Sequence, residues 1–223
     1  MATVQNRSNV LAIRNAPVQS RSRARLQEIL GAAENIIAER GTDQLKMNDV
    51  ATEANVPIGA VYNFFPNRTA LIAHLLKQHL DTMCSIEAVV NMTRGPWKTP
   101  AEFAQIMVDS ITAIHFFVRR NKVFREIWSG ALAYREIREI DLQDSKMNAA
   151  DFSKQLRRLD KDIDEEALQA KALAIVHLLG SCMRMASMLD RQSADQIVKS
   201  YTFMALAHAG FDKKTINSVK FTF

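Results

Sequence analysis

The stretch DVATEANVPIGAVYNFFPNRTAL, residues 49–71, decides the fold that we expect for this chain. A short helix is predicted over about residues 47–54, because its apolar side chains recur at helical spacing. Asn55 tolerates the left-handed conformation that ends a helix, and Pro57 suits a helix start because it has no backbone N–H to lose. A second short helix follows. Residues 46–65 are therefore predicted to form a helix-turn-helix, with an ordinary three-helix scaffold as the alternative.

Longer helices are predicted on both sides of this stretch. Before it, residues 22–40 repeat apolar side chains at i, i+3 and i+4, the pattern of an amphipathic helix, and Gly41 supplies the stop. After it, Asn67 is a suitable N-cap for a longer helix that continues to about residue 92. The two short helices thus have a longer helix to pack against on either side.

The composition favours an all-α protein. Of 223 residues, 48% are hydrophobic and 24% charged, and only seven Gly and five Pro interrupt the chain. Scarce helix breakers favour helices over short, turn-separated strands. Beyond a linker at 93–96, helices are predicted over 100–120, 122–133, 134–159 (a break at 144–145 is left open), 164–189 and 193–209, with capping residues at Thr99, Asp164 and Ser193. The predicted organisation is a flexible basic arm (1–21), a helix-turn-helix domain (22–70), a connecting helix (71–92) and a larger helical domain (93–223).

Positive charge gathers before the first predicted helix. The formal net charge is +5, and the first 27 residues contain Arg7, Arg14, Arg21, Arg23 and Arg25 but no acidic side chain. This distribution suits a polyanionic partner such as nucleic acid, although a solvated basic tail has the same composition.

The sequence predicts no metal site, cofactor or membrane span. Cys84 and Cys182 lack close Cys or His neighbours, so neither a disulfide framework nor a zinc site is expected. A signal-peptide core and a run of about eighteen apolar residues are both missing, which predicts a cytoplasmic protein. No G-x-S-x-G, P-loop, H-E-x-x-H or dinucleotide fingerprint occurs, so no catalytic residue is predicted.

Residues 49–71 resemble the signature of the TetR family, commonly written D-I-A-x-x-A-G-V-x-x-G-x-x-Y-x-x-F-x-x-K-x-x-L. With the preceding amphipathic helix, the resemblance covers about fifty residues. It implies an N-terminal helix-turn-helix domain followed by a larger helical domain for ligand binding and dimerisation. Val50 replaces Ile, Asn55 replaces Gly, and Arg68 replaces Lys, which keeps the charge but exchanges a point ammonium for a planar fork. Just before the pattern, Lys46 and Met47 stand where the family often has Thr.

The resemblance also implies DNA contacts residue by residue. The second short helix would enter the major groove, where Asn63 could pair with adenine. Tyr62 would donate its hydroxyl to a phosphate, and Arg68 would meet the phosphate backbone beside it. Ile58 and Ala60 offer no hydrogen bonds to bases, so sequence preference would also draw on methyl contacts or DNA shape. The predicted DNA-binding set is Arg21, Arg23, Arg25, Lys46, Asn48, Ile58, Gly59, Ala60, Tyr62, Asn63 and Arg68.

Beyond Leu71 the expectations follow from architecture alone. The last two long helices, within 164–209, would form a four-helix interface with a second copy of the chain; an intramolecular core is the alternative. A cavity for a small apolar or aromatic effector would lie mainly within 99–142, although core packing is the alternative for each of its residues. The predicted lining is Phe103, Met107, Ile111, His115, Phe116, Trp128, Tyr134 and His177.

The implied function is that of a dimeric repressor that leaves a pseudo-palindromic DNA operator when a small effector binds. Two alternatives come from other classes: a helical DNA-binding or protein-interaction module without an effector, and an enzyme. The missing catalytic motifs disfavour the enzyme.

Overall fold

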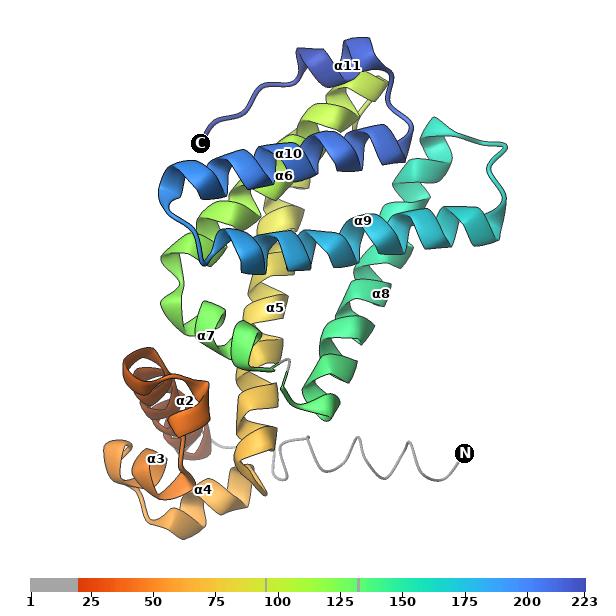
Figure 1. Cartoon of the computed structure of the whole chain (residues 1–223). Coiled ribbons are helices and arrows are strands. Elements are labelled where there is room, and N and C mark those ends of the chain that lie inside the picture. The colour runs from red at the N-terminus through yellow and green to blue at the C-terminus, as the bar shows by residue number, and fades with distance from the viewer. Residues whose placement is uncertain (1–19, 95, 132) are drawn as a thin grey trace. The chain divides into compact units, whose positions relative to one another are not determined.

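The computed structural model describes residues 20–94, 96–131 and 133–223, and every regular element in these ranges is helical (Figure 1). The prediction of an all-α protein is confirmed. The elements are α2 (Ser20–Arg40), the 3-10 helix η1 (Thr42–Gln44), α3 (Met47–Glu53), α4 (Ile58–Phe64), α5 (Arg68–Arg94), α6 (Pro100–Arg120), α7 (Lys122–Ala131), α8 (Arg135–Leu159), α9 (Glu165–Ala186), α10 (Arg191–Ala209) and α11 (Lys213–Ser218).

The turn between α3 and α4 has the predicted conformation. Asn55 has a φ of 52°, the one positive value at a non-glycine residue among those that the structure describes. The N–H of Asn55 donates to the carbonyl of Thr52 at 3.1 Å, and the N–H of Val56 donates to the carbonyl of Ala51 at 3.0 Å. These bonds satisfy carbonyl groups at the end of α3 while the chain turns toward α4.

Side-chain caps fix several of the longer helices. Asn67, Thr99 and Asp164 each accept a hydrogen bond from the backbone N–H three residues later, at 2.8, 3.2 and 3.0 Å, as predicted. The predicted cap at Ser193 is wrong. Asp190 accepts the N–H of Ser193 at 3.1 Å and is itself the N-cap, so α10 begins earlier than expected.

The chain divides into two compact units. The first contains the described residues up to Leu80 together with Asn121–Ile140, and the second contains Asp81–Arg120 and Asp141–Phe223. α5 and α8 therefore contribute to both units. The domain division predicted from sequence, with boundaries at 70 and 92, stays a prediction; the compact units differ from it by including residues 121–140 with the helix-turn-helix.

The first unit has a continuous apolar core. α2 contacts α3, and α3 contacts α4, around fully buried side chains such as Ile29, Val50, Val61 and Phe65. Burying one such side chain contributes about 1.5–3 kcal/mol. The two short helices are therefore held in place by the core rather than by their own length.

α7 completes this core. It contacts α2 and η1, and it buries Phe124, Ile127 and Trp128. The rings of Phe124 and Trp128 stack with centroids 4.9 Å apart. Ile137, in the first turn of α8, is also fully buried in this unit. Residues 121–140 are thus part of the body that holds the helix-turn-helix.

The second unit is a helical bundle. α9 and α10 lie side by side, α6 contacts both, and α11 contacts α6 and α10 (Figure 1). α8 runs without the break that was left open at 144–145. Among the described residues, α6 is the one helix long and apolar enough to cross a membrane, but 56% of its apolar window is buried within the protein. Such burial is typical of the core helix of a soluble protein.

Candidate DNA-binding surface and sensor region

The outer face of α4 is the most distinctive surface of the first unit. Val61 and Phe64 are buried and fix the inner face of the helix. On the outer face, Ile58 is 37% and Tyr62 45% exposed. Gly59 and Asn63 are also exposed, and Ala60 is half-buried. The residues predicted to approach DNA on this helix therefore share one outer surface.

Gly59 adds no side chain to that surface. A Cβ atom built at Gly59 would have no atom of the protein within 4 Å. Packing inside the protein therefore does not require glycine here. Glycine in a helix costs stability relative to alanine, so its presence suits a close approach by an external partner.

The head of α3 lies next to this surface in sequence and is also open. Lys46 and Asn48 are exposed, and Lys46, at the N-cap position, makes no side-chain capping bond. Arg40 of α2 forms an ion pair with Asp49 of α3 at 3.7 Å. This pair ties α3 to the first long helix and leaves Lys46 and Asn48 facing solvent.

Arg21, Arg23 and Arg25 lie in the first turns of α2 and are exposed. The arm predicted over 1–21 is therefore shorter at its C-terminal end, because α2 already begins at Ser20. A helix places these three arginines at fixed positions, whereas an arm would leave them variable. The remainder of the predicted arm, 1–19, lies outside the described residues.

Arg68, predicted to meet a phosphate, is bonded inside the first unit. Its Nη2 donates to the carbonyl of Thr42 at 3.1 Å and to the hydroxyl of Tyr134. The guanidinium also lies 5.5 Å from the centre of the Tyr134 ring, and Asp43 is 3.9 Å away. The phosphate contact of Arg68 stays a prediction, and the side chain already has internal partners in the first unit.

The residues predicted to line an effector cavity fall into both units. Trp128 and Tyr134 belong to the first unit, where Trp128 is in the core and Tyr134 binds Arg68. The other six belong to the second unit. Among them Phe103, Met107 and Ile111 are buried along α6.

The three remaining predicted residues have protein partners. The buried His115 makes a 2.8 Å hydrogen bond with Asp195, so it is a satisfied core histidine. The ring of Phe116 lies 5.9 Å from the guanidinium of Arg120. His177 Nδ1 shares a 3.0 Å hydrogen bond with the hydroxyl of Ser145.

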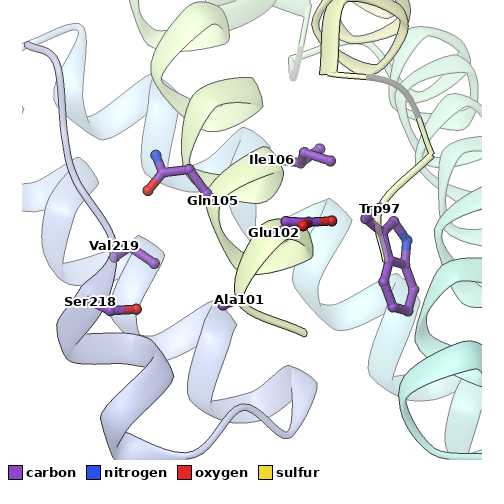
Figure 2. A pocket seen from close by; sticks show the side chains of 7 residues that line it. All are labelled: Trp97, Ala101, Glu102, Gln105, Ile106, Ser218 and Val219. Atoms are coloured by element: carbon purple, nitrogen blue, oxygen red, sulfur yellow. The ribbon is translucent and has the colours of Figure 1, made fainter. Parts of the chain in front are cut away.

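A pocket of about 400 Å³ opens on the second unit at the start of α6 (Figure 2). Glu102 and Ile106 point toward Trp97, whereas Gln105 points toward Val219. The lining residues are Trp97, Ala101, Glu102, Gln105, Ile106, Ser218 and Val219. None of the eight predicted effector residues belongs to this lining, so the predicted cavity and this pocket are different places.

A polar cluster that sequence reasoning missed lies where α8 meets α9 in the second unit. Arg184 forms an ion pair with Asp141 at 3.8 Å, with only 12% of each side chain exposed. Burial, with the Asp141 and Asp81 carboxylates, raises the pKa of Asp144 to about 6, and a hydrogen bond from Asn148 opposes this rise. Asp141 and Asp144 lie one helical turn apart, a spacing that also fits a solvated helix face, and Asp81 lies far from both in the sequence. No sequence signal therefore distinguishes these aspartates.

Two family models match the chain. The model described as bacterial regulatory proteins of the tetR family matches residues 29–75, and the model described as the tetracyclin repressor-like C-terminal domain matches residues 101–208.

The chain belongs to the TetR family.

Members of this family are transcription regulators that bind DNA, so the helix-turn-helix predicted from sequence is confirmed as the DNA-binding part of the chain. The second match covers most of α6 to α10, which assigns these helices to the C-terminal domain of a TetR-family protein. No curated protein matches the chain.

Solved structures of TetR-type regulators have a similar fold. RolR in complex with resorcinol is 15% identical, with 99% of this chain and 98% of RolR covered and a TM-score of 0.62. A TetR transcriptional regulator from Rhodococcus sp. RHA1 is 16% identical, with 85% and 98% covered and a TM-score of 0.57. The fatty acid degradation regulator FadR from Bacillus halodurans is 17% identical, with 84% and 100% covered and a TM-score of 0.58. At these identities the likeness concerns the fold alone.

In this TetR-family chain, α9 and α10 carry exposed apolar side chains. Leu178 and Met185 of α9 are exposed, Met204 of α10 is 65% exposed, and Met188 (74% exposed) and Leu189 lie in the turn that joins the two helices. Exposed apolar side chains of this size suit contact with another apolar surface. We call these five residues the α9–α10 face. They lie within 164–209, the segment predicted to dimerise.

Sequence reasoning also missed the contact between η1 and α7 of this TetR-family protein. The buried Thr42 donates its hydroxyl to the carbonyl of Glu126 at 2.8 Å. A Cβ atom at Gly130 would lie 2.9 Å from Cβ of Thr42, so α7 approaches η1 too closely for any other residue there. The one available signal in the sequence was Gly130 inside a helical pattern, which indicates a close approach but not which residue approaches.

Proposed function

We propose that the chain is a cytoplasmic homodimeric repressor whose two α4 helices read successive major grooves of a pseudo-palindromic DNA operator. One observation carries the proposal: α4 exposes Gly59, Tyr62 and Asn63, with the apolar Ile58, on its outer face while Val61 and Phe64 hold its inner face in the core. A helix of this kind fits a major groove about 12 Å wide. The family of the chain supplies the wider function, regulation of transcription.

The proposed DNA contacts divide into two kinds. Ile58, Gly59, Ala60 and Asn63 approach base edges, and Asn63 supplies the hydrogen bonds that distinguish adenine. Phosphate contacts fix the register and carry the salt-dependent affinity. The residues proposed to contact phosphates are Tyr62, Lys46, Asn48, Arg21, Arg23 and Arg25.

The proposed dimer is formed through the α9–α10 face. Two copies related by a twofold axis would bring α9 and α10 of each chain into a four-helix interface. This arrangement covers Leu178, Met188 and Met204, which are open to solvent in the single chain. A twofold dimer also matches the symmetry of a palindromic operator.

The proposed effector is a small aromatic or apolar molecule bound within the second unit. The proposed lining is Phe103, Met107, Ile111, His115, Phe116 and His177. RolR, which has a similar fold, was crystallised with resorcinol, a precedent for a small aromatic ligand. Trp128 and Tyr134 are left out of the lining because their side chains pack in the first unit. We assign no catalytic role to any residue.

Footprinting on the DNA upstream of the chain's own gene tests the proposal. We expect protection of a short palindrome with half-sites about one helical turn apart, which weakens when the correct small aromatic compound is added. Protection of a single half-site contradicts the dimer. Protection that no compound in a broad aromatic and fatty-acyl panel changes favours a DNA-binding module without an effector, and no protection at any salt concentration contradicts the regulator.

A further inference from the structure

Residues 121–140 belong to the first unit, although the chain on both sides of them belongs to the second. The chain leaves the second unit after Arg120, contributes α7 and the first turn of α8 to the first unit, and returns to the second unit after Ile140. Together with α5, this segment is the covalent route from the effector-binding unit to the helices that read DNA. Contacts that hold this segment against the helix-turn-helix therefore affect how effector binding in the second unit changes the DNA-reading helices.

The first fastening is made by Thr42. Its hydroxyl donates to the carbonyl of Glu126, and its Cβ fills the space above Gly130. Thr42 lies in η1, which directly precedes the DNA-binding α3 in the chain. Because Gly130 has no side chain, the backbone of α7 can pack directly against the side chain of Thr42.

The second fastening is made by Arg68, at the first residue of α5. Nη2 of an arginine carries two hydrogens, and in Arg68 one is directed to the carbonyl of Thr42 and the other to the hydroxyl of Tyr134. The flat guanidinium also faces the ring of Tyr134. One side chain thus joins η1, α5 and the turn that precedes α8.

We propose that Arg68 is a positioning residue, which latches residues 121–140 to the helix-turn-helix through Thr42 and Tyr134 so that α7 and the DNA-reading helices move as one body. Its regulatory meaning rests on the proposed function. The proposal also accounts for the departure of Arg68 from the family's lysine, because a lysine keeps the charge but lacks the planar fork. A phosphate contact through Nη2 would require one of the two internal bonds to open.

Hydrogen exchange of the free, full-length protein tests the latch without any DNA. Tyr134→Phe removes the hydroxyl acceptor and keeps the ring. Loss of a hydrogen bond to a charged group corresponds to about 1.5 kcal/mol, so exchange in α7 should become about tenfold faster, while exchange in α9 and α10 stays unchanged. Arg40→Gln is the matched control, because it breaks an ion pair of the same unit between α2 and α3. Unchanged α7 exchange in Tyr134→Phe, or an equal rise in Arg40→Gln, would overturn the latch.

DNA binding then separates positioning from direct contact. We use a duplex selected from a random-sequence pool. Binding should slow exchange in both α4 and α7 of the unmodified protein, but only in α4 of Tyr134→Phe. Arg68→Ala should weaken binding with an unchanged dependence on salt. A salt slope lower by about 0.9, the value of one phosphate, would instead make Arg68 a direct DNA contact and overturn the positioning role. Failure to select any duplex would refute the proposed function, whereas the exchange of the free protein still decides the latch.

Discussion

Two exposed surfaces of this molecule differ sharply in chemistry. The outer face of α4 presents Gly59, Tyr62 and Asn63, which are small or able to form hydrogen bonds. The α9–α10 face presents leucine and methionine side chains, which form no hydrogen bonds with a phosphate or a base edge. The difference teaches that exposure alone does not identify a partner: the first surface suits a polar groove, and the second suits another apolar surface.

The largest effect is expected from a charge on the α9–α10 face. Leu178→Glu should prevent the dimer from forming, because a carboxylate would be buried without a partner. Losing the second half-site should weaken binding to a palindrome about 100-fold or more. Sedimentation and DNA titration measure the two effects. Met147→Glu is the matched control, since Met147 is 62% exposed, against 53% for Leu178, but lies on α8. If it has the same effect, the dimer surface is assigned incorrectly.

A smaller effect is expected from a methyl group on α4. Gly59→Ala should weaken DNA binding about tenfold, because an added methyl must be accommodated against a base or phosphate at a cost of about 1–3 kcal/mol. The protein itself should become more stable by up to about 1 kcal/mol. Gly31→Ala, in α2, also has open space around its Cβ and serves as the control. It should stabilise the protein and leave DNA affinity unchanged. Equal affinities for both variants would exclude a close approach at Gly59.

Substitutions of the two polar side chains of α4 should change different properties of DNA binding. Asn63→Ala should reduce discrimination between the preferred duplex and a duplex with one changed base pair by about tenfold, because base hydrogen bonds are lost. Tyr62→Phe should weaken binding to both duplexes by about fivefold, as expected for one lost hydrogen bond of about 1 kcal/mol. Competition titrations with the two duplexes measure both quantities. A loss of discrimination in Tyr62→Phe instead would place Tyr62 on a base.

The smallest effect is expected away from both surfaces, at Asp144. Its pKa in the folded protein, about 6, is above the ordinary value of 3.8, so the folded state binds more protons between these values and stability falls as pH rises through this range. Asp144→Asn should remove this fall. Allowing for partial exposure, we expect a gain of roughly 1 kcal/mol, or about 2–4 °C in Tm, at about pH 8, and little gain at about pH 4.5. An equal gain at both pH values would exclude ionisation as the cause. DNA affinity and dimerisation should not change.

The elements that depend on local chemistry could be predicted from the sequence. The left-handed Asn55 and the caps at Asn67, Thr99 and Asp164 involve groups within a few residues of one another, and the helical periodicity of α2 specifies its buried face. At Ser193 the same reasoning failed, because Asp190 competes for the same N–H groups and lies at the start of the helix. Local signals choose the type of element more reliably than its first residue.

The partners of distant residues could not be predicted. The apolar pattern of α7 indicates that Phe124, Ile127 and Trp128 are buried, but it does not say against which helix, and Trp128 was therefore assigned to an effector cavity. The internal partner of Arg68 could not be predicted for a similar reason, since Tyr134 lies 66 residues away, and the phosphate contact of Arg68 stays a prediction. Long-range packing depends on the whole topology, which a single sequence pattern does not contain.

The passage of residues 121–140 through the first unit has a consequence for protein engineering. A transplanted DNA-reading module that stopped at Leu80 would leave Phe124, Ile127 and Trp128 behind and open the core that they cover. A single crossover between two related genes would likewise create a hybrid core with mismatched shapes. A chimera that transfers residues 20–80 and 121–140 together keeps the original packing, so the portable module of this regulator consists of two separate segments of its gene.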